Sequence, residues 1–194
     1  MKTLAFPLMV IFCSVPMIAH ASSPAEQIQE TIQEIMTIVN SPAAGTEIKK
    51  QQALRDTVMP RFDWSEMAKQ ALGRHWDSVP ARQDEFIAAF AEFLGKTYIG
   101  KIGSYKNEKI IFVDEVVKNS IAEVKTKVIP ANGEATSVNY QLRQVAGEWK
   151  IYDVVVEDIS LVTNYRSQFN RILSRGNFDD LLRQLRQKEV AQGN

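Results

Sequence analysis

The spacing of apolar residues changes twice along this chain, and that change constrains the fold more than any other feature. Between Phe86 and Ile102 apolar side chains recur every three or four residues, which is typical of one helix face. From Lys109 onward the period is two, as in half-buried strands, and from Leu161 the helical spacing returns. This order predicts an α+β domain in which helices precede and follow a sheet.

The middle third of the chain predicts a four-stranded sheet. The expected strands are 109–118, 120–130, 135–145 and 148–157, separated by Asn119-Ser120, Ala131-Asn132-Gly133 and Ala146-Gly147. Because these connections are short, consecutive strands should pair as a twisted antiparallel meander. In the second strand Ala122, Val124, Thr126 and Val128 alternate with Glu123, Lys125 and Lys127. One face of the sheet is therefore expected to be buried and the other to face water.

Helix start and stop signals flank this sheet. Ser23 and Glu26 have the spacing of a capping box, with Pro24 at the first helical position. Further helices are expected over 47–59, over 63–72 with Asp63 and Glu66 as a second cap pair and Gly73 as the stop, and over two C-terminal segments divided at Gly176 and capped by Asn177.

The first residues have the layout of a cleaved secretory signal peptide. Lys2 precedes an apolar run from Leu4 to Ile18, and Ala19-His20-Ala21 offers small residues at both positions that a signal peptidase reads. A membrane anchor is the alternative, but about 15 apolar residues fall short of the roughly 20 that span a bilayer. We expect residues 1–21 to be the signal peptide and residues 22–194 to form a single exported domain.

Composition excludes several classes of function. The only cysteine, Cys13, lies in the segment expected to be removed, so the exported chain has no thiolate nucleophile or Cys-ligated metal. Without Lys2 the chain carries 22 Lys and Arg against 23 Asp and Glu, a formal charge of −1, which gives no field to attract nucleic acid. We expect no metal, no cofactor and no nucleic-acid partner, and a monomer.

Three stretches carry a resemblance to a known family. The first is Pro60-Arg61-Phe62-Asp63-Trp64 with Met67-Ala68, Ala71-Leu72-Gly73 and Trp76; the second is Phe86, Phe90, Leu94 and Tyr98, leading to Tyr105; the third runs from Tyr152-Asp153-Val154 through Glu157 to Ser160-Leu161-Val162, Asn164-Tyr165-Arg166 and Gln168-Phe169. In this order they resemble the MlaC family of periplasmic phospholipid-binding proteins, also described as toluene-tolerance auxiliary proteins. Asp158 departs from the pattern, since such proteins more usually have Gly there.

The resemblance implies both a fold and a function. It implies a sheet wrapped by helices as a nuclear-transport-factor-like cone with an apolar cavity, and it implies no catalysis. A periplasmic carrier of this kind binds phospholipid as ligand and shuttles it between an outer-membrane lipoprotein complex and an inner-membrane ABC transporter complex with an MCE-domain protein. Such transport maintains the lipid asymmetry of the outer membrane.

An acyl chain needs a deep apolar slot, and the apolar faces supply candidates for its lining. We expect lipid contacts from the long helix and the turn after it (Phe90, Leu94, Tyr98, Ile102, Tyr105), from the sheet (Val124, Val128, Tyr140, Leu142, Tyr152, Val154, Val156) and from the following helix at the mouth (Leu161, Tyr165, Phe169). The alternative for each residue is an ordinary packed core.

Arginines dominate the C-terminal helices, where Arg166, Arg171, Arg175, Arg183, Arg186 and Lys188 outnumber Asp179, Asp180 and Glu189. Arg166 belongs to the Asn164-Tyr165-Arg166 motif and follows a residue expected at the mouth. We expect it to contact a lipid phosphate or an acidic partner surface.

Two other classes of function stay open at this stage. An isomerase-like enzyme would use Asp114 or Asp153 as an acid or base in an apolar pocket, whereas His75 has no evident catalytic partner beyond Asp77. An adaptor module without ligand would have a solid core.

Overall fold

The computed structural model describes residues 22–41, 46–105, 108–131 and 133–187, and the expected signal peptide lies outside these residues. The helices are α1 (Pro24–Asn40), α2 (Glu47–Val58), α3 (Trp64–Leu72), α4 (Gln83–Gly103), α5 (Leu161–Leu173) and α6 (Phe178–Gln187), with short 3₁₀ turns at Met59–Arg61, Gly73–Ser78 and Pro80–Arg82. No helix within the described ranges has both the length and the hydropathy to cross a bilayer.

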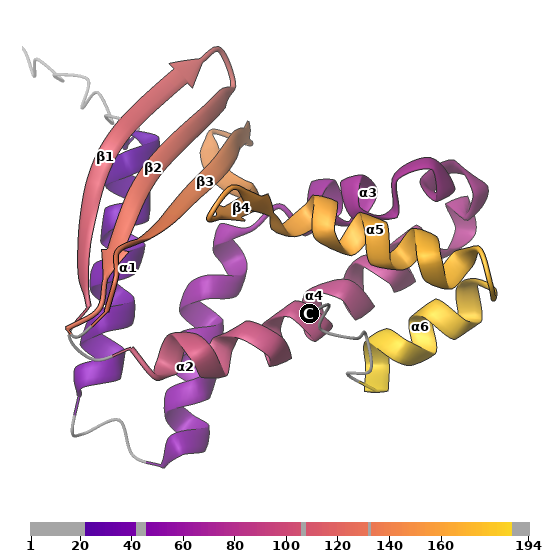
Figure 1. Cartoon of the computed structure of the whole chain (residues 1–194), viewed down its shortest axis with the longest axis horizontal. Helices are drawn as coiled ribbons and strands as arrows, with labels where there is room; N and C mark the ends of the chain where they lie inside the picture. Colours follow the sequence, from indigo (N-terminus) through magenta and orange to yellow (C-terminus); the bar gives the residue numbers. More distant parts are fainter. Residues whose placement is uncertain (1–21, 42–45, 106–107, 132, 188–194) are drawn as a thin grey trace, which may run out of the picture.

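The sheet is open and antiparallel, with strands in the order of the sequence (Figure 1). The strands are β1 (Lys109–Lys118), β2 (Ile121–Ile129), β3 (Thr136–Val145), β4 (Glu148–Val156) and β5 (Ile159–Ser160). The α+β class and the antiparallel meander are confirmed. The expected count of four strands is one too low, because β5 has only two residues and is too short to show a period of its own.

The first helix begins as its sequence predicts. The Ser23 hydroxyl accepts a hydrogen bond from the Glu26 amide at 3.2 Å, and the Glu26 carboxylate accepts one from the Ser23 amide at 2.8 Å, so the capping box is complete. A second carboxylate joins from the sheet, since Glu115 of β1 accepts from the Ala25 amide at 2.9 Å. A negative charge at the N-terminus of a helix also interacts favourably with the helix dipole.

The cap of α3 is confirmed only in part. Asp63 accepts from the Glu66 amide at 3.0 Å, but the reciprocal bond from Glu66 expected from the sequence is wrong. The sheet supplies better partners for both groups. The Asp63 amide donates to the Ile151 carbonyl of β4 at 2.8 Å, and the carboxylates of Asp63 and Glu66 both accept from Arg143 of β3.

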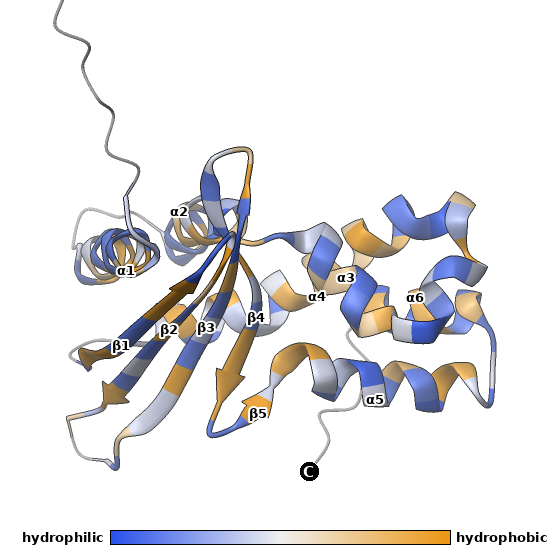
Figure 2. Ribbon diagram, turned by 90° about the horizontal axis from the view of Figure 1, so that it is seen from above, coloured by the Kyte–Doolittle hydropathy of each residue, from blue (hydrophilic) through white to orange (hydrophobic). Residues whose placement is uncertain are grey.

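Three hydrophobic clusters make up the interior. One lies among α3, α4, α5 and α6, a second between α1 and the sheet, and a third where α1 and α2 meet the C-terminal half of α4. Figure 2 shows the same division, with α1 and α2 beside the sheet and α3, α5 and α6 gathered beyond its β4–β5 edge. Phe62 packs against all three clusters.

The turn between β4 and β5 carries backbone strain. Glu157 and Asp158 have φ values of 46° and 62°, which is the left-handed region that favours glycine. The sequence pointed to this position, because the resembling family usually has Gly where this chain has Asp158. Asp tolerates the conformation better than most residues, so the turn forms without it.

Replacing Asp158 by glycine should therefore stabilise the protein. We expect Asp158→Gly to raise the free energy of unfolding by about 1 kcal/mol, because glycine adopts a left-handed conformation without the Cβ clash. Urea unfolding of the two proteins measures the difference. Asp158→Ala is the control and should give no gain; equal stabilities of parent and Asp158→Gly would show that the turn is unstrained.

Candidate functional site

One face of the sheet, which we call the inner face, packs against α1 at one end and is progressively uncovered toward the other. Near α1 the row Ala122, Leu142 and Ile151 is buried. In the next row Val124 is buried, whereas its neighbours Tyr140 and Val154 are only half-buried. Burial thus decreases along the strands rather than across them.

The last two rows form what we call the open end of the inner face. They hold Phe112, Thr126, Val138 and Val156, then Ile110, Val128 and Thr136. Only Thr126 is buried among them, and the side chain of Val156 is 41% exposed. Tyr105, which follows α4 at this end of the sheet, and Ile159 of β5 add exposed apolar surface. The chain thus presents a largely apolar, incompletely covered surface inside the fold, which is the kind of lining that an acyl chain requires.

Hydroxyl pairs occur at two points, one on this apolar surface and the other in the cluster among α3, α4, α5 and α6. Burial raises the pKa of Tyr140 to about 12, while a hydrogen bond with Thr126 acts in the opposite direction and nearby Tyr105 adds to the rise. The pKa of Tyr165 is also raised, first by burial and then by its hydrogen bond with Tyr98. Tyr140 and Tyr165 stay neutral at ordinary pH, so they offer hydrogen bonds without adding charge to their apolar surroundings.

The structure distributes the expected lipid-contact residues over all three clusters. Phe90, Leu94, Tyr165 and Phe169 are buried in the helical cluster, where their rings stack and meet edge to face at centroid distances of 5.4–5.7 Å. Tyr98 and Leu161 are half-buried against that cluster, Val124, Leu142, Tyr140 and Val154 belong to the sheet cluster, and Ile102 packs on the third cluster. Their half-buried members, together with Tyr105, Val128 and Val156, are the ones free to meet a ligand.

Two expected contacts lie apart from the inner face. Tyr152 stands at the register shift in β4, packs against the helical cluster, and has its pKa raised first by burial and then by the carboxylate of Asp153. Arg166 donates from Nε to the Gln70 carbonyl at 2.6 Å and lies against Gly73. It thereby ties α5 to the C-terminal end of α3, and a headgroup contact for it stays a prediction.

The expected contacts omitted three apolar residues of the open end, namely Ile110, Phe112 and Val138, and its two threonines, Thr126 and Thr136. The register shift between Phe112 and Asp114 makes Val113 an extra residue of β1. Simple alternation of faces along the sequence is therefore out of phase on one side of this bulge. The pairs Ile110–Val128 and Phe112–Thr126 would have shown the correct phase, because cross-strand partners share a face.

The carboxylates considered for catalysis have other partners. Asp153 accepts from the Val162 amide at 3.0 Å and from the Ser160 hydroxyl at 2.5 Å, so it caps the start of α5. Asp114 is exposed and pairs with Lys125 at 3.5 Å. His75 contacts Asn170 at 3.0 Å instead of Asp77. This arrangement gives neither aspartate the free position in an apolar pocket that acid–base chemistry would need.

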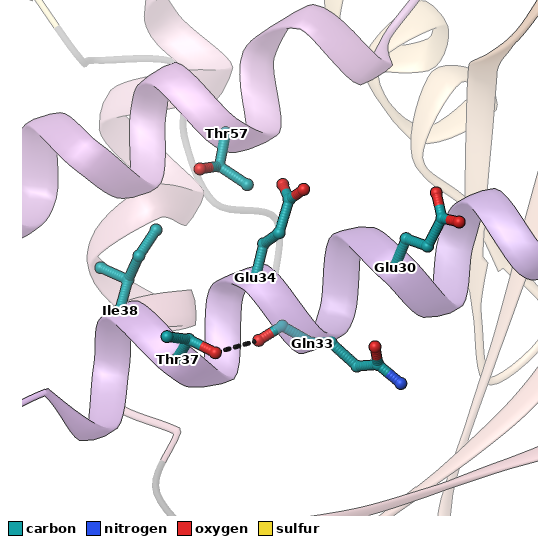
Figure 3. Close-up of a pocket in the computed structure, with 6 residues that line it drawn as sticks. All are labelled: Glu30, Gln33, Glu34, Thr37, Ile38 and Thr57. Carbon is teal, nitrogen blue, oxygen red and sulfur yellow. Dashed lines mark hydrogen bonds between the residues drawn. The ribbon is translucent and has the colours of Figure 1, made fainter.

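A separate hollow of about 450 Å³ lies between α1 and α2 (Figure 3). Five of its six lining residues are polar, and the Thr37 hydroxyl donates to the Gln33 carbonyl at 2.9 Å. Glu30 and Glu34 face it, and Glu34 pairs with Arg61 at 3.6 Å. A polar, acidic groove of this kind does not suit an acyl chain.

Comparison with known proteins decides the family. A family model described as the MlaC protein matches residues 29–187, which is most of the chain. This chain belongs to the MlaC family. The resemblance expected from the sequence is thereby confirmed.

The relatives differ in how much of each chain they cover. The intermembrane phospholipid transport system binding protein MlaC of Haemophilus influenzae is 26% identical over 140 residues, covering 69% of this chain and 65% of that protein, slightly less than two thirds. Toluene tolerance protein ttg2D of Pseudomonas putida is 26% identical over 183 residues, covering 89% and 83%. A phospholipid-binding protein from Ralstonia solanacearum, solved with a phospholipid, superposes with a TM-score of 0.72 at 25% identity, covering 86% of this chain and 96% of that one.

Several MlaC-like motif residues in this chain hold elements together. The Trp64 indole donates to the Met59 carbonyl at 2.9 Å, Asp63 joins α3 to the sheet, and Asp153 with Ser160 joins β4 to α5. These residues surround the sheet and position its inner face without lying on it. The MlaC signature in the sequence therefore reports mainly on the frame around the site.

The raised pKa of Tyr140 predicts how the protein responds to alkali. Because the folded pKa of about 12 exceeds the ordinary value, the neutral phenol contributes stability below about pH 10 that is lost as the pH rises toward 12. Ultraviolet titration of phenolate absorbance should show a late-ionising tyrosine that disappears in Tyr140→Phe. If the component lost in the variant had its midpoint near the ordinary tyrosine pKa of about 10, the assignment would be contradicted.

Proposed function

We propose that this chain is a phospholipid carrier that binds acyl chains against the open end of the inner face. In the cell it would work in the periplasm, after cleavage of the signal peptide, and shuttle lipid between an outer-membrane lipoprotein complex and an inner-membrane MCE-protein ABC transporter. That transport would maintain outer-membrane lipid asymmetry. The observation that carries the proposal is the apolar inner face, which loses its cover from the Ala122 row to the Ile110 row.

The energetics of transfer fit such a carrier. Burial contributes about 0.8 kcal/mol per methylene, so one sixteen-carbon chain represents about 12 kcal/mol relative to water. A lipid in a bilayer already has that burial, so a carrier needs only to match the membrane. The net free energy of transfer can then lie near zero, and the partners at each membrane would set the direction.

The named relatives support the same assignment. One is a binding protein of an intermembrane phospholipid transport system, and the solved structure of similar fold holds a phospholipid. The second relative is named for toluene tolerance. None of these names describes a catalyst, so we propose a binding function without chemistry.

Bound lipid is the most direct test. The exported protein, purified from its bacterial host without detergent, should release phospholipid when extracted with organic solvent, and mass spectrometry of the extract identifies it. Folded protein that carries no lipid and takes up none from vesicles would contradict the proposal.

A matched pair of variants locates the site on the inner face. Tyr140→Asp places a charge among Val124, Val154 and the open end, where burial of an unpaired carboxylate is costly, and we expect it to lose bound lipid by at least tenfold. Asn139→Asp changes the next residue on the opposite face, directly across from Lys125, and should keep its lipid. Val154→Arg should behave like Tyr140→Asp.

Circular dichroism and thermal unfolding of each variant show whether the fold is retained. Lipid extraction is then compared only among folded variants. Equal lipid content in Tyr140→Asp, Val154→Arg and Asn139→Asp would remove the inner face from the proposed site.

A further inference from the structure

The two C-terminal helices use a single type of cation. From Leu161 to Gln187 the described chain contains five arginines and no lysine, against two aspartates, whereas the strands of the sheet carry five lysines. A guanidinium is a planar fork that binds phosphate or carboxylate through two parallel hydrogen bonds, which an ammonium cannot do. The choice of arginine thus points to recognition of an oxyanion rather than to charge alone.

Three of these arginines have partners within the protein. Arg166 donates to the Gln70 carbonyl, Arg183 pairs with Asp180 at 2.5 Å, and Arg186 pairs with Glu85 at 2.5 Å. Asp179 pairs instead with Arg82 of the turn before α4. The acidic groups near these helices are therefore already engaged.

Arg171 and Arg175 are different. Both are exposed, Arg171 in the last turn of α5 and Arg175 in the turn that follows it, and within the described residues neither has an acidic partner. Like charges held near each other repel. The α5 C-terminus offsets part of that cost, and an anion between the two would offset the rest.

These two arginines line an open hollow of about 320 Å³ at the α5–α6 turn, together with Arg183. Gly176 also lines the hollow, and a Cβ there would come within 2.6 Å of the Asp180 carboxylate, which would have to move. Asp180 also lines the hollow, but both of its oxygens are used: one accepts from the Asn177 amide at 3.0 Å and the other from Arg183.

We infer that this hollow is a docking site for the phosphate groups of an anionic phospholipid membrane. The volume accommodates a phosphate, three guanidiniums surround it, and two of them have no acidic partner among the described residues. Figures 1 and 2 place the α5–α6 turn at the end of the molecule away from the sheet, so the site is distinct from the acyl-chain surface. Its purpose rests on the proposed carrier function, because a carrier must approach membranes.

Vesicle flotation tests the inference with the exported protein. It should bind phosphatidylcholine vesicles that contain phosphatidylglycerol, fail to bind pure phosphatidylcholine, and be released more by inorganic phosphate than by chloride at equal ionic strength. The double variant Arg171→Gln with Arg175→Gln should weaken binding about 30-fold, because it removes two cations that each make the usual contribution of a cation near an anionic surface. The control Lys49→Gln with Lys118→Gln removes the same charge from α2 and β1 and should weaken binding far less.

Substitution of both arginines by lysine distinguishes the effect of bidentate hydrogen bonding from the effect of positive charge. Arg171→Lys with Arg175→Lys should also weaken binding, though less than the glutamine pair, because charge remains but bidentate contact is lost. The inference would be overturned if the glutamine or the lysine double variant bound vesicles as well as the parent does. It would also be overturned if the Lys49→Gln with Lys118→Gln control lost as much binding as the arginine-to-glutamine variant. Lipid extracted from all of these variants should match the parent; lost lipid with intact vesicle binding would count against the carrier function and leave the docking site standing.

Discussion

The attachment of residues 60–64 to the sheet is the contact on which the rest of the structure depends. Phe62 pairs with Ile151 through a parallel bridge and reaches all three hydrophobic clusters with one ring. Arg143 and the Ile151 carbonyl hold the neighbouring Asp63 from the sheet side. This joint, the bonds of Asp153 to the start of α5 and the packing of α1 on α2 and α4 hold the sheet and the helical body together. Two separate small units would bury too little surface to be stable alone.

The same joint explains why the inner face can remain partly uncovered. The buried aromatic rings of α4 and α5 stabilise the helical body by themselves, and Ala122, Leu142 and Ile151 secure α1 to the sheet. The fold therefore does not depend on packing at the open end for its stability. A protein whose stability lies elsewhere can keep an apolar surface for a ligand, as the trade-off between stability and function requires.

The sequence predicted the order of elements well because helix and strand periods, caps and turns are local signals. Ser23, Asn177 and Gly73 behaved as their positions suggested. Partners that are distant in the sequence explain the predictions for Glu66 and Arg166 that the structure does not follow. Glu66 accepts from Arg143, which lies 77 residues further along the chain, and Arg166 donates to Gln70. For the site, apolar periodicity could not separate packed rings such as Phe169 from half-buried ones such as Tyr140, since both lie on apolar faces and only the tertiary cover differs.

Because burial decreases along the inner face, a ligand bound there would add to the stability of the folded chain. Anything that covers Tyr140, Val154 and the rows beyond them adds buried apolar surface, and a ligand that binds only the folded chain stabilises it by mass action. At a ligand concentration a hundred times the dissociation constant this amounts to about 2.7 kcal/mol. A loaded carrier would then unfold and be degraded more slowly than one that has delivered its lipid, so the lifetime of the protein would follow the supply of its cargo.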